Sequence, residues 1–157
     1  MFKLSDEGLK KVQEELKRYE SKNSAIIPAL YIAQKENGGW ISEEIIGYLS
    51  EVMGLPASKI NEVFKFYTMF NQKPVGQYHV QFCNNISCVL NGSREVASEV
   101  LNKMHTKIND ISLDGKYCFS FVECLGSCGT APMMQINDEY YENLTAEKAV
   151  EIIKGLK

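Results

Sequence analysis

The sequence predicts an α/β protein in two parts: an N-terminal helical bundle over residues 1–73, then a small α/β domain over residues 74–157. Two observations lead to this prediction. Up to about residue 70, apolar residues recur at helical spacing between capping residues, prolines and glycines. From residue 77 onward, apolar and polar residues first alternate, and strand and helix patterns then follow in the order β-α-β-β-α. The boundary is expected near residues 71–76.

Four helices are expected in the first part. Ser5 can cap the first, which has acidic residues at its start and basic residues at its end, as the helix dipole favours. The second is expected over 24–36 and the fourth from about residue 58 to Phe66. The third is expected over 42–54, with Ser42 as its cap and Gly54 at its end. The aromatic run 63–70 is expected to lie mostly in the core, because it has helical spacing. The alternative is that part of the run forms a docking patch, since large exposed apolar surfaces mark interfaces.

The second part begins with an alternating strand that ends at Cys83. A helix over about 93–105 and a turn at Asp114-Gly115 lead to a second strand that runs into Cys124. The segments 133–136 and 139–142 are expected to form a hairpin around Asn137-Asp138. A last helix is expected to begin after Thr145, whose hydroxyl can cap it.

Four of the five cysteines form two close pairs. Four residues separate Cys83 from Cys88, three separate Cys124 from Cys128, and each pair directly follows a predicted strand. Neighbouring strands can bring the two loops together at one edge of the sheet. A binuclear iron–sulfur cluster takes four thiolates, two on each iron, so these pairs suit a [2Fe–2S] cluster.

The residues around the pairs suit a negatively charged cluster. Gly126 and Gly129 allow backbone N–H groups to turn toward sulfur, and the hydroxyls of Ser87 and Ser127 are expected to donate there too. No Lys or Arg lies within either loop.

Other uses of these residues remain open. Structural zinc sites favour a two-residue spacer, which neither pair has, but a zinc-bound structural adaptor without electron transfer is the alternative function. Thiol–disulfide exchange needs a Cys-x-x-Cys at a helix N-terminus, and neither cysteine pair has this spacing. A Rieske-type site needs two histidines, but His79 and His105 are expected to be structural or surface residues. Cys118, inside the second strand, is expected to be a buried free thiol.

Composition excludes several classes. The apolar fraction of 45% and charged fraction of 24% indicate a globular chain, and a net charge of −3 argues against nucleic-acid binding. Apolar runs such as Ile26 to Ala33 are much shorter than the ~20 residues that span a bilayer, so no direct membrane insertion is expected. The N-terminus lacks signal or transit features, so we expect a cytoplasmic protein whose reduced cysteines bind metal.

With the cysteines placed, residues 38–145 resemble a known family: the thioredoxin-like [2Fe–2S] subunit of bacterial complex I and of NAD(P)-reducing or electron-bifurcating hydrogenases. The resemblance depends on Cys83-x4-Cys88 followed by Leu-Asn-Gly-Ser, and above all on the block Val-Glu-Cys-Leu-Gly-Ser-Cys-Gly-Thr-Ala-Pro from Val122 to Pro132. The Gly-Trp-Ile-Ser and Phe-Tyr-Thr-Met-Phe stretches of the helical part also fit.

The resemblance implies a thioredoxin-like domain after an N-terminal helical bundle, with one [2Fe–2S] cluster on Cys83, Cys88, Cys124 and Cys128. It also implies docking on a flavin- and NAD(P)-binding iron–sulfur subunit, within a larger hetero-oligomeric redox complex. FMN and NAD(P) are expected on that partner, because the chain shows no dinucleotide or phosphate-loop motif. The isolated chain is expected to exchange single electrons without turnover of its own. A regulatory domain that senses redox state by losing its cluster is a further possibility.

Overall fold

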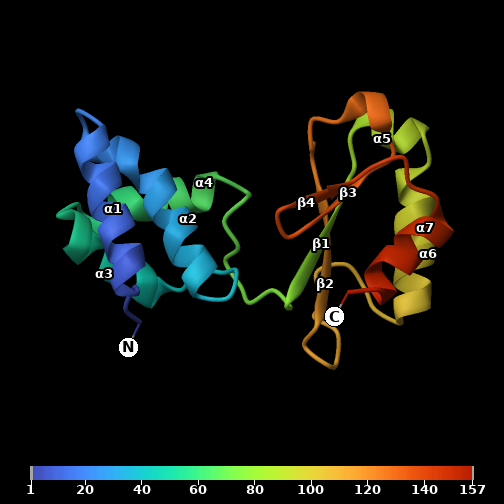
Figure 1. Ribbon diagram of the computed structural model, residues 1–157, viewed down its shortest axis with the longest axis horizontal. Helices are drawn as coiled ribbons and strands as arrows, with labels where there is room; N and C mark the ends of the chain where they lie inside the picture. Colours follow the sequence, from blue (N-terminus) through green and yellow to red (C-terminus); the bar gives the residue numbers. More distant parts are fainter. Residues whose placement is uncertain (1, 157) are drawn as a thin grey trace. The chain divides into compact units, whose positions relative to one another are not determined.

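The computed structural model describes residues 2–156, and it divides into two compact units with the boundary between Val75 and Gly76 (Figure 1). The first unit is helical, and the second combines a four-stranded sheet with helices. This mixed architecture confirms the predicted fold class. Within residues 2–156, none of the helices is long and apolar enough to cross a membrane.

The four helices predicted for the first unit are present. A 3-10 turn at Lys22–Ala25 precedes the second of them, so regular α-helix begins there two residues later than predicted. The helices are α1 Asp6–Arg18, α2 Ile26–Glu36, α3 Glu43–Met53 and α4 Ala57–Phe66.

Capping residues set the helix ends where the sequence indicated. The Ser5 hydroxyl accepts a hydrogen bond from the Gly8 N–H at 3.0 Å, and the Ser42 hydroxyl accepts one from the Ile45 N–H at 3.3 Å. Both bonds satisfy amide groups that have no partner inside the helix. Gly54 ends α3 in a left-handed conformation, with φ of 62°, that glycine adopts without steric cost.

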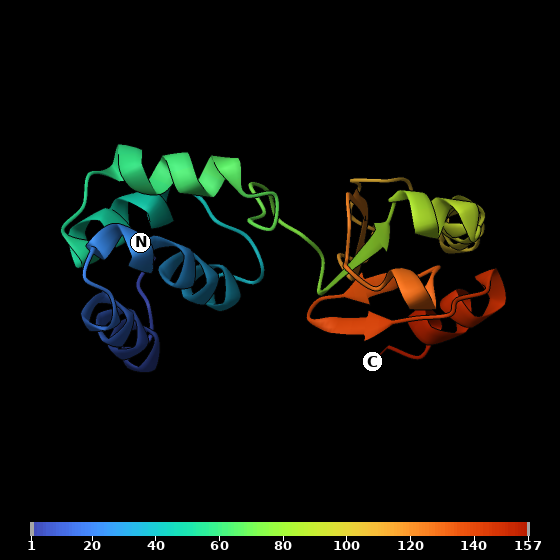
Figure 2. The ribbon, with the colours of Figure 1, turned by 90° about the horizontal axis from the view of Figure 1, so that it is seen from above.

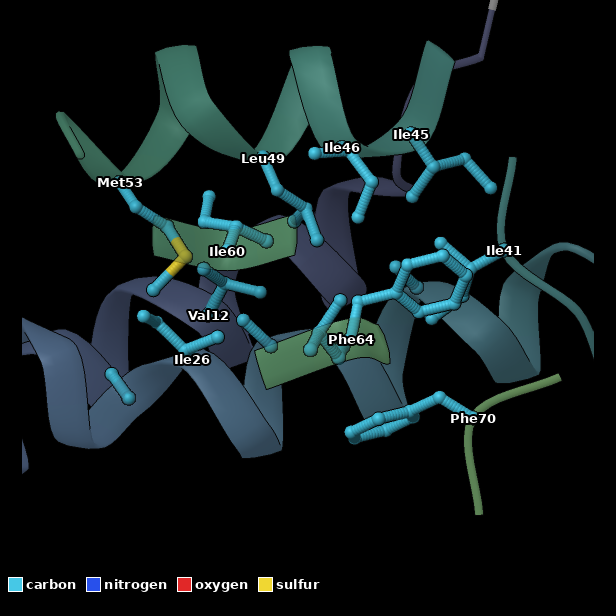
Figure 3. Packing of buried hydrophobic residues seen from close by; sticks show 14 of the residues in the cluster. Val12, Ile26, Ile41, Ile45, Ile46, Leu49, Met53, Ile60, Phe64 and Phe70 are labelled. Carbon is cyan, nitrogen blue, oxygen red and sulfur yellow. The ribbon is translucent and has the colours of Figure 1, made fainter. Parts of the chain in front are cut away.

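Apolar faces of all four helices make the core of the first unit. Figure 3 shows side chains of α3, such as Leu49 and Met53, pointing toward Val12 of α1 and Ile26 of α2. The aromatic run is divided: Phe64 and Phe70 are buried, but the Phe66 side chain is 78% exposed. The prediction that this run is mostly core is therefore wrong for Phe66, Tyr67 and Met69, whose side chains are exposed.

The second unit is built on a sheet with strand order β2-β1-β3-β4. The central strand β1 pairs in parallel with β2 and antiparallel with β3, and β3 pairs with β4 as the predicted hairpin. Helices α6 and α7 lie side by side on one side of this sheet (Figures 1 and 2). The bounds are β1 Tyr78–Cys83, α6 Ser93–Met104, β2 Tyr117–Val122, β3 Met134–Ile136, β4 Glu139–Tyr141 and α7 Ala146–Lys154.

The core of this unit lies between the sheet and α6 and α7. Phe82 of β1 stacks on Phe119 of β2, with ring centroids 6.4 Å apart, and both side chains are buried. At the start of β1 the backbone of Gly76 passes very close to β2. A Cβ atom there would lie 2.8 Å from the carbonyl oxygen of Lys116, so only glycine fits without a shift of backbone.

Two short helical turns were not predicted, and both carry cysteines. The helix α5, Ile86–Leu90, contains Cys88, and a 3-10 turn at Cys128–Thr130 begins at the last cysteine. The side chain of Asn85 caps α5 by accepting a hydrogen bond from the Ile86 N–H at 2.8 Å. The prediction that both cysteine pairs lie in irregular loops is therefore wrong at Cys88 and at Cys128.

The segment between α6 and β2 follows the outer edge of the sheet. The Asn109 N–H donates to the Phe119 carbonyl at 2.7 Å, and the Ser112 N–H donates to the Tyr117 carbonyl at 2.8 Å. Ile111 forms an isolated bridge with Cys118 between these two contacts. The segment therefore takes up hydrogen-bonding groups that the edge strand β2 turns outward.

Candidate metal centre

The parallel pairing of β1 with β2 brings the two cysteine segments to one end of the sheet. Cys83, the last residue of β1, is in register with Val122, the last residue of β2. The Asn84 N–H donates to the Val122 carbonyl at 2.9 Å, so the two chains remain together just beyond the strands. Cys124 follows two residues later. The predicted meeting of the two segments at one edge is confirmed.

The four thiols differ in their surroundings. Cys83 and Cys88 are 3% and 2% exposed and pack against Met133, whereas Cys124 and Cys128 are exposed. Burial, followed by the neighbouring Cys83 thiol, raises the pKa of Cys88 to about 11. Metal ligation requires the thiolate, so a metal bound by Cys88 would displace a proton.

A hydrogen bond joins the two cysteine segments directly. The Ser87 hydroxyl, on α5, donates to the carbonyl oxygen of Cys128 at 2.9 Å. In Figure 1, α5 and the 3-10 turn that begins at Cys128 lie at the same end of the sheet. The bond fixes the spacing between the segment that carries Cys88 and the segment that carries Cys128.

The expected hydrogen bonds to sulfur are found only in part. The Gly126 N–H donates to the Cys124 sulfur at 3.3 Å, and Gly126 has a φ of 76°, which confirms the role predicted for this glycine. The prediction for the two serine hydroxyls is wrong in this structure. Each hydroxyl has one proton, and Ser87 donates it to a carbonyl while Ser127 donates it to the Glu142 carboxylate.

Three side chains that sequence reasoning missed reach the cysteine segments. The Tyr140 hydroxyl donates to the Leu125 carbonyl at 2.9 Å, and the Glu142 carboxylate accepts from Ser127 and Thr130. Those two hydroxyls lower the pKa of Glu142, so the group is a carboxylate at neutral pH. Arg94 of α6 is the third.

Arg94 places a positive charge beside the first segment, although no basic residue lies within it. Its Nε donates to the Asn84 side chain at 3.1 Å, and Asn84 directly follows Cys83. A cation in the first turn of a helix opposes the helix dipole, and this is the sequence signal that could have pointed to Arg94.

The remaining sequence candidates lie outside the site. His79 is buried in β1, where its Nε2 lies 2.8 Å from the Ser120 hydroxyl. His105 is exposed at the end of α6 in a left-handed conformation. Cys118 is a buried free thiol, as predicted. Burial raises its pKa, so it remains in the uncharged thiol form.

The thiols come in two pairs, which is the arrangement that a binuclear cluster uses. No group of three or more His, Cys, Asp or Glu side chains in residues 2–156 converges closely enough to hold one ion. A binuclear cluster has a different requirement, because each of its two irons takes two thiolates. The structure offers a buried pair and an exposed pair, joined through Ser87.

Comparison with known proteins places the chain in a family. Residues 12–157 match the family described as thioredoxin-like [2Fe-2S] ferredoxin. A subunit of the NADH-quinone oxidoreductase of Rickettsia bellii (strain RML369-C) is 40% identical over 158 residues, covering 99% of this chain and 95% of the relative. The mitochondrial NADH dehydrogenase [ubiquinone] flavoprotein 2 of Dictyostelium discoideum is 37% identical, covering 99% of this chain and 64% of that protein.

Solved structures share the fold. A chain of the NAD+-reducing [NiFe]-hydrogenase in the air-oxidized state superposes with a TM-score of 0.68 at 20% identity, over 80% of this chain. This chain spans 22% of the length of that hydrogenase chain. The fold, the family match and the relatives agree with the resemblance seen in the sequence. The chain belongs to the family of thioredoxin-like [2Fe–2S] ferredoxins and carries a [2Fe–2S] cluster.

Proposed function

We propose that this chain is the electron-transfer subunit of a multisubunit NAD(P)H-linked oxidoreductase, with its cluster held by Cys83, Cys88, Cys124 and Cys128. The observation that carries the proposal is the position of the two cysteine pairs, at the ends of two parallel neighbouring strands. A rigid sheet holds the bases of both segments, while short turns adapt to the cluster. Such a support suits electron transfer, in which the ligands have to stay in place between two oxidation states.

The four proposed cysteine ligands hold different sides of the cluster. When bound, the cluster takes up and gives back one electron at a time. Cys83 and Cys88 hold the side that faces the protein interior, where Met133 packs against them. Cys124 and Cys128 hold the side that is open to solvent or to a partner. Gly126 directs its N–H at the Cys124 sulfur, which stabilises negative charge there.

The names of the relatives support a partner that binds flavin and nicotinamide. One relative is a subunit of NADH-quinone oxidoreductase, another is a flavoprotein of NADH dehydrogenase, and the structural match is an NAD+-reducing hydrogenase. This sequence has no dinucleotide-binding or phosphate-loop motif of its own. We therefore assign FMN and NAD(P) to a partner iron–sulfur subunit, and we expect no turnover from the isolated chain.

We also propose a cytoplasmic location. Four cluster ligands and one buried thiol account for the five cysteines, and such a use of cysteine is typical of a reducing compartment.

The test is to express the chain without oxygen and to measure iron, acid-labile sulfide and the EPR spectrum after reduction. Wild-type protein should contain about two irons and two sulfides per chain, with an S = 1/2 signal when reduced. Cys124→Ala should lose most of the iron, whereas Cys118→Ala, a matched control, should keep all of it. A colourless chain that holds one zinc would replace the proposal with a structural adaptor. Full iron content in Cys124→Ala would refute the ligand assignment.

A further inference from the structure

Glu142, directly after β4, holds the two hydroxyl groups on either side of Cys128. The Thr130 hydroxyl donates to Oε1 of Glu142 at 2.6 Å, and the Ser127 hydroxyl donates to the same oxygen. The two hydroxyl oxygens are themselves 2.7 Å apart. Between Ser127 and Thr130 lie only Cys128 and Gly129. The carboxylate therefore links the residue before the 3-10 turn, Ser127, to the last residue of the turn, Thr130.

An anionic acceptor suits this arrangement. Each hydroxyl has a single proton, so Ser127 and Thr130 both donate to Glu142 only when neither hydroxyl donates to the other. Hydrogen bonds to a carboxylate are shorter and stronger than those between neutral groups. The Thr130 hydroxyl also lies 3.2 Å from the Ser127 carbonyl, so it contacts both the carboxylate and the backbone of the turn.

Hydrogen bonds to neighbouring segments hold the backbone around Glu142 in place. The next residue, Asn143, donates its N–H to the Thr130 carbonyl at 2.8 Å, and the Leu144 N–H donates to the Pro132 carbonyl at 3.0 Å. Lys148 of α7 donates to the Glu142 carbonyl at 2.8 Å. The backbone that carries the carboxylate is therefore fixed to α7 and to the chain that leads into β3.

Cys128 depends on these hydrogen bonds for its position because apolar packing does not hold its side chain. Its side chain is exposed, whereas Cys88 in the other segment is buried among apolar atoms. An exposed ligand keeps its position through hydrogen bonds around it, since partners of metal ligands orient the ligand and affect metal retention. Two such contacts are present: Ser87 at the Cys128 carbonyl, and Glu142 at the flanking hydroxyls.

We propose that Glu142 is a positioning residue for the cluster, which retains iron at Cys128 by fixing the hydroxyls of Ser127 and Thr130. The inference depends on the proposed function, because it takes Cys128 as a ligand. The Glu142 carboxylate acts on the cysteine through these two neighbours, from which it accepts its hydrogen bonds.

The experiment compares Glu142→Ala, Glu142→Gln and Glu139→Ala in the full cluster-loaded chain. Glu139 is an exposed carboxylate of the adjoining strand β4 and serves as the matched control. The readouts are the rate of iron transfer to a ferrous chelator and the g-values of the reduced cluster. Glu142→Ala should lose iron about tenfold faster, as expected for removal of hydrogen bonds to a charged group, and should shift the g-values. Glu142→Gln keeps an acceptor oxygen and should restore most of the retention, and Glu139→Ala should match wild type.

A second variant covers the case in which Glu142→Ala fails to fold. Ser127→Ala with Thr130→Val keeps the carboxylate but removes both donors, and it should lose iron as fast as Glu142→Ala. Adding Glu142→Ala to that pair should cause no further acceleration. Wild-type retention in Glu142→Ala, or extra loss in the triple variant, would overturn the inference while the cluster assignment stands. A wild-type chain without iron would instead overturn the proposed function.

Discussion

The substitution His79→Gln should make the stability of the α/β unit less sensitive to acid. His79 lies in the central strand with its side chain buried, and Gln can keep a polar contact with the Ser120 hydroxyl, which is 2.8 Å from Nε2. Burial lowers the pKa of His79 from its ordinary 6.5 to about 4. In the native protein this histidine is therefore neutral down to about pH 4, while in the unfolded chain it takes up a proton near pH 6.5.

The sign and size of this pH dependence follow from the difference between the pKa values of His79 in the folded and unfolded states. The unfolded state binds more protons between the two pKa values, so the stabilisation is complete above pH 6.5 and is lost as the pH falls toward 4. At about 1.4 kcal/mol for each pKa unit, the full loss is about 3 kcal/mol. Between pH 7.5 and 5.5 the same relation gives a loss of about 1.3 kcal/mol from this one residue.

The assay is urea unfolding of wild type, His79→Gln and His105→Asn at both pH values. His105 is exposed and has a φ of 51°, a conformation that Asn tolerates, so this variant controls for loss of a histidine. Wild type and His105→Asn should lose about 1.3 kcal/mol more than His79→Gln between pH 7.5 and 5.5. An equal loss in all three proteins would show that burial does not keep His79 uncharged, and would refute the reasoning.

Three further predictions concern single residues. Gly76→Ala should destabilise the α/β unit by about 2 kcal/mol or more in urea unfolding, because the new methyl group would meet the Lys116 carbonyl at 2.8 Å; a loss below about 0.5 kcal/mol would contradict the close approach. Gly47→Ala, in the middle of α3, should instead stabilise the helical unit by about 0.5–1 kcal/mol, because the new methyl group would meet no atom within 4 Å beyond its own helix backbone and chain neighbours; destabilisation would count against that geometry. Arg94→Gln should lower the midpoint potential of the cluster in a redox titration, because it removes the positive charge that lies beside Asn84; an unchanged potential would place Arg94 outside the electrostatic influence of the site.

Local signals allowed much of the fold to be predicted. The hydroxyls of Ser5 and Ser42 and the backbone of Gly54 act within a few residues of where they stand, so their roles follow from the sequence alone. The alternation of apolar and polar residues also marked β1 and β2, although burial does not alternate along them: His79 and Cys118, on the opposite face of the sheet, are buried too. The neighbouring pairing of these strands then brings Cys83 and Cys124 to one end of the sheet.

The parts that were missed depend on contacts between distant residues or on very short elements. The helix α5 has only five residues, too few for a helical period to emerge, and two of them, Ile86 and Leu90, are exposed apolar side chains. Glu142 reaches Ser127 across 15 residues of chain, and its role follows only once the hairpin is folded. The serine hydroxyls illustrate the same limit, because their donor capacity was clear but their acceptors were not.

The segment along the outer side of β2 has a consequence for how this chain behaves before it meets any partner. A free strand edge offers its backbone groups to other copies of the same protein, which is a common route to aggregation. Here the carbonyls of Tyr117 and Phe119 already accept from Ser112 and Asn109. An intruding chain would have to displace that segment first. One edge of the sheet is therefore shielded against self-association before the chain joins a larger complex.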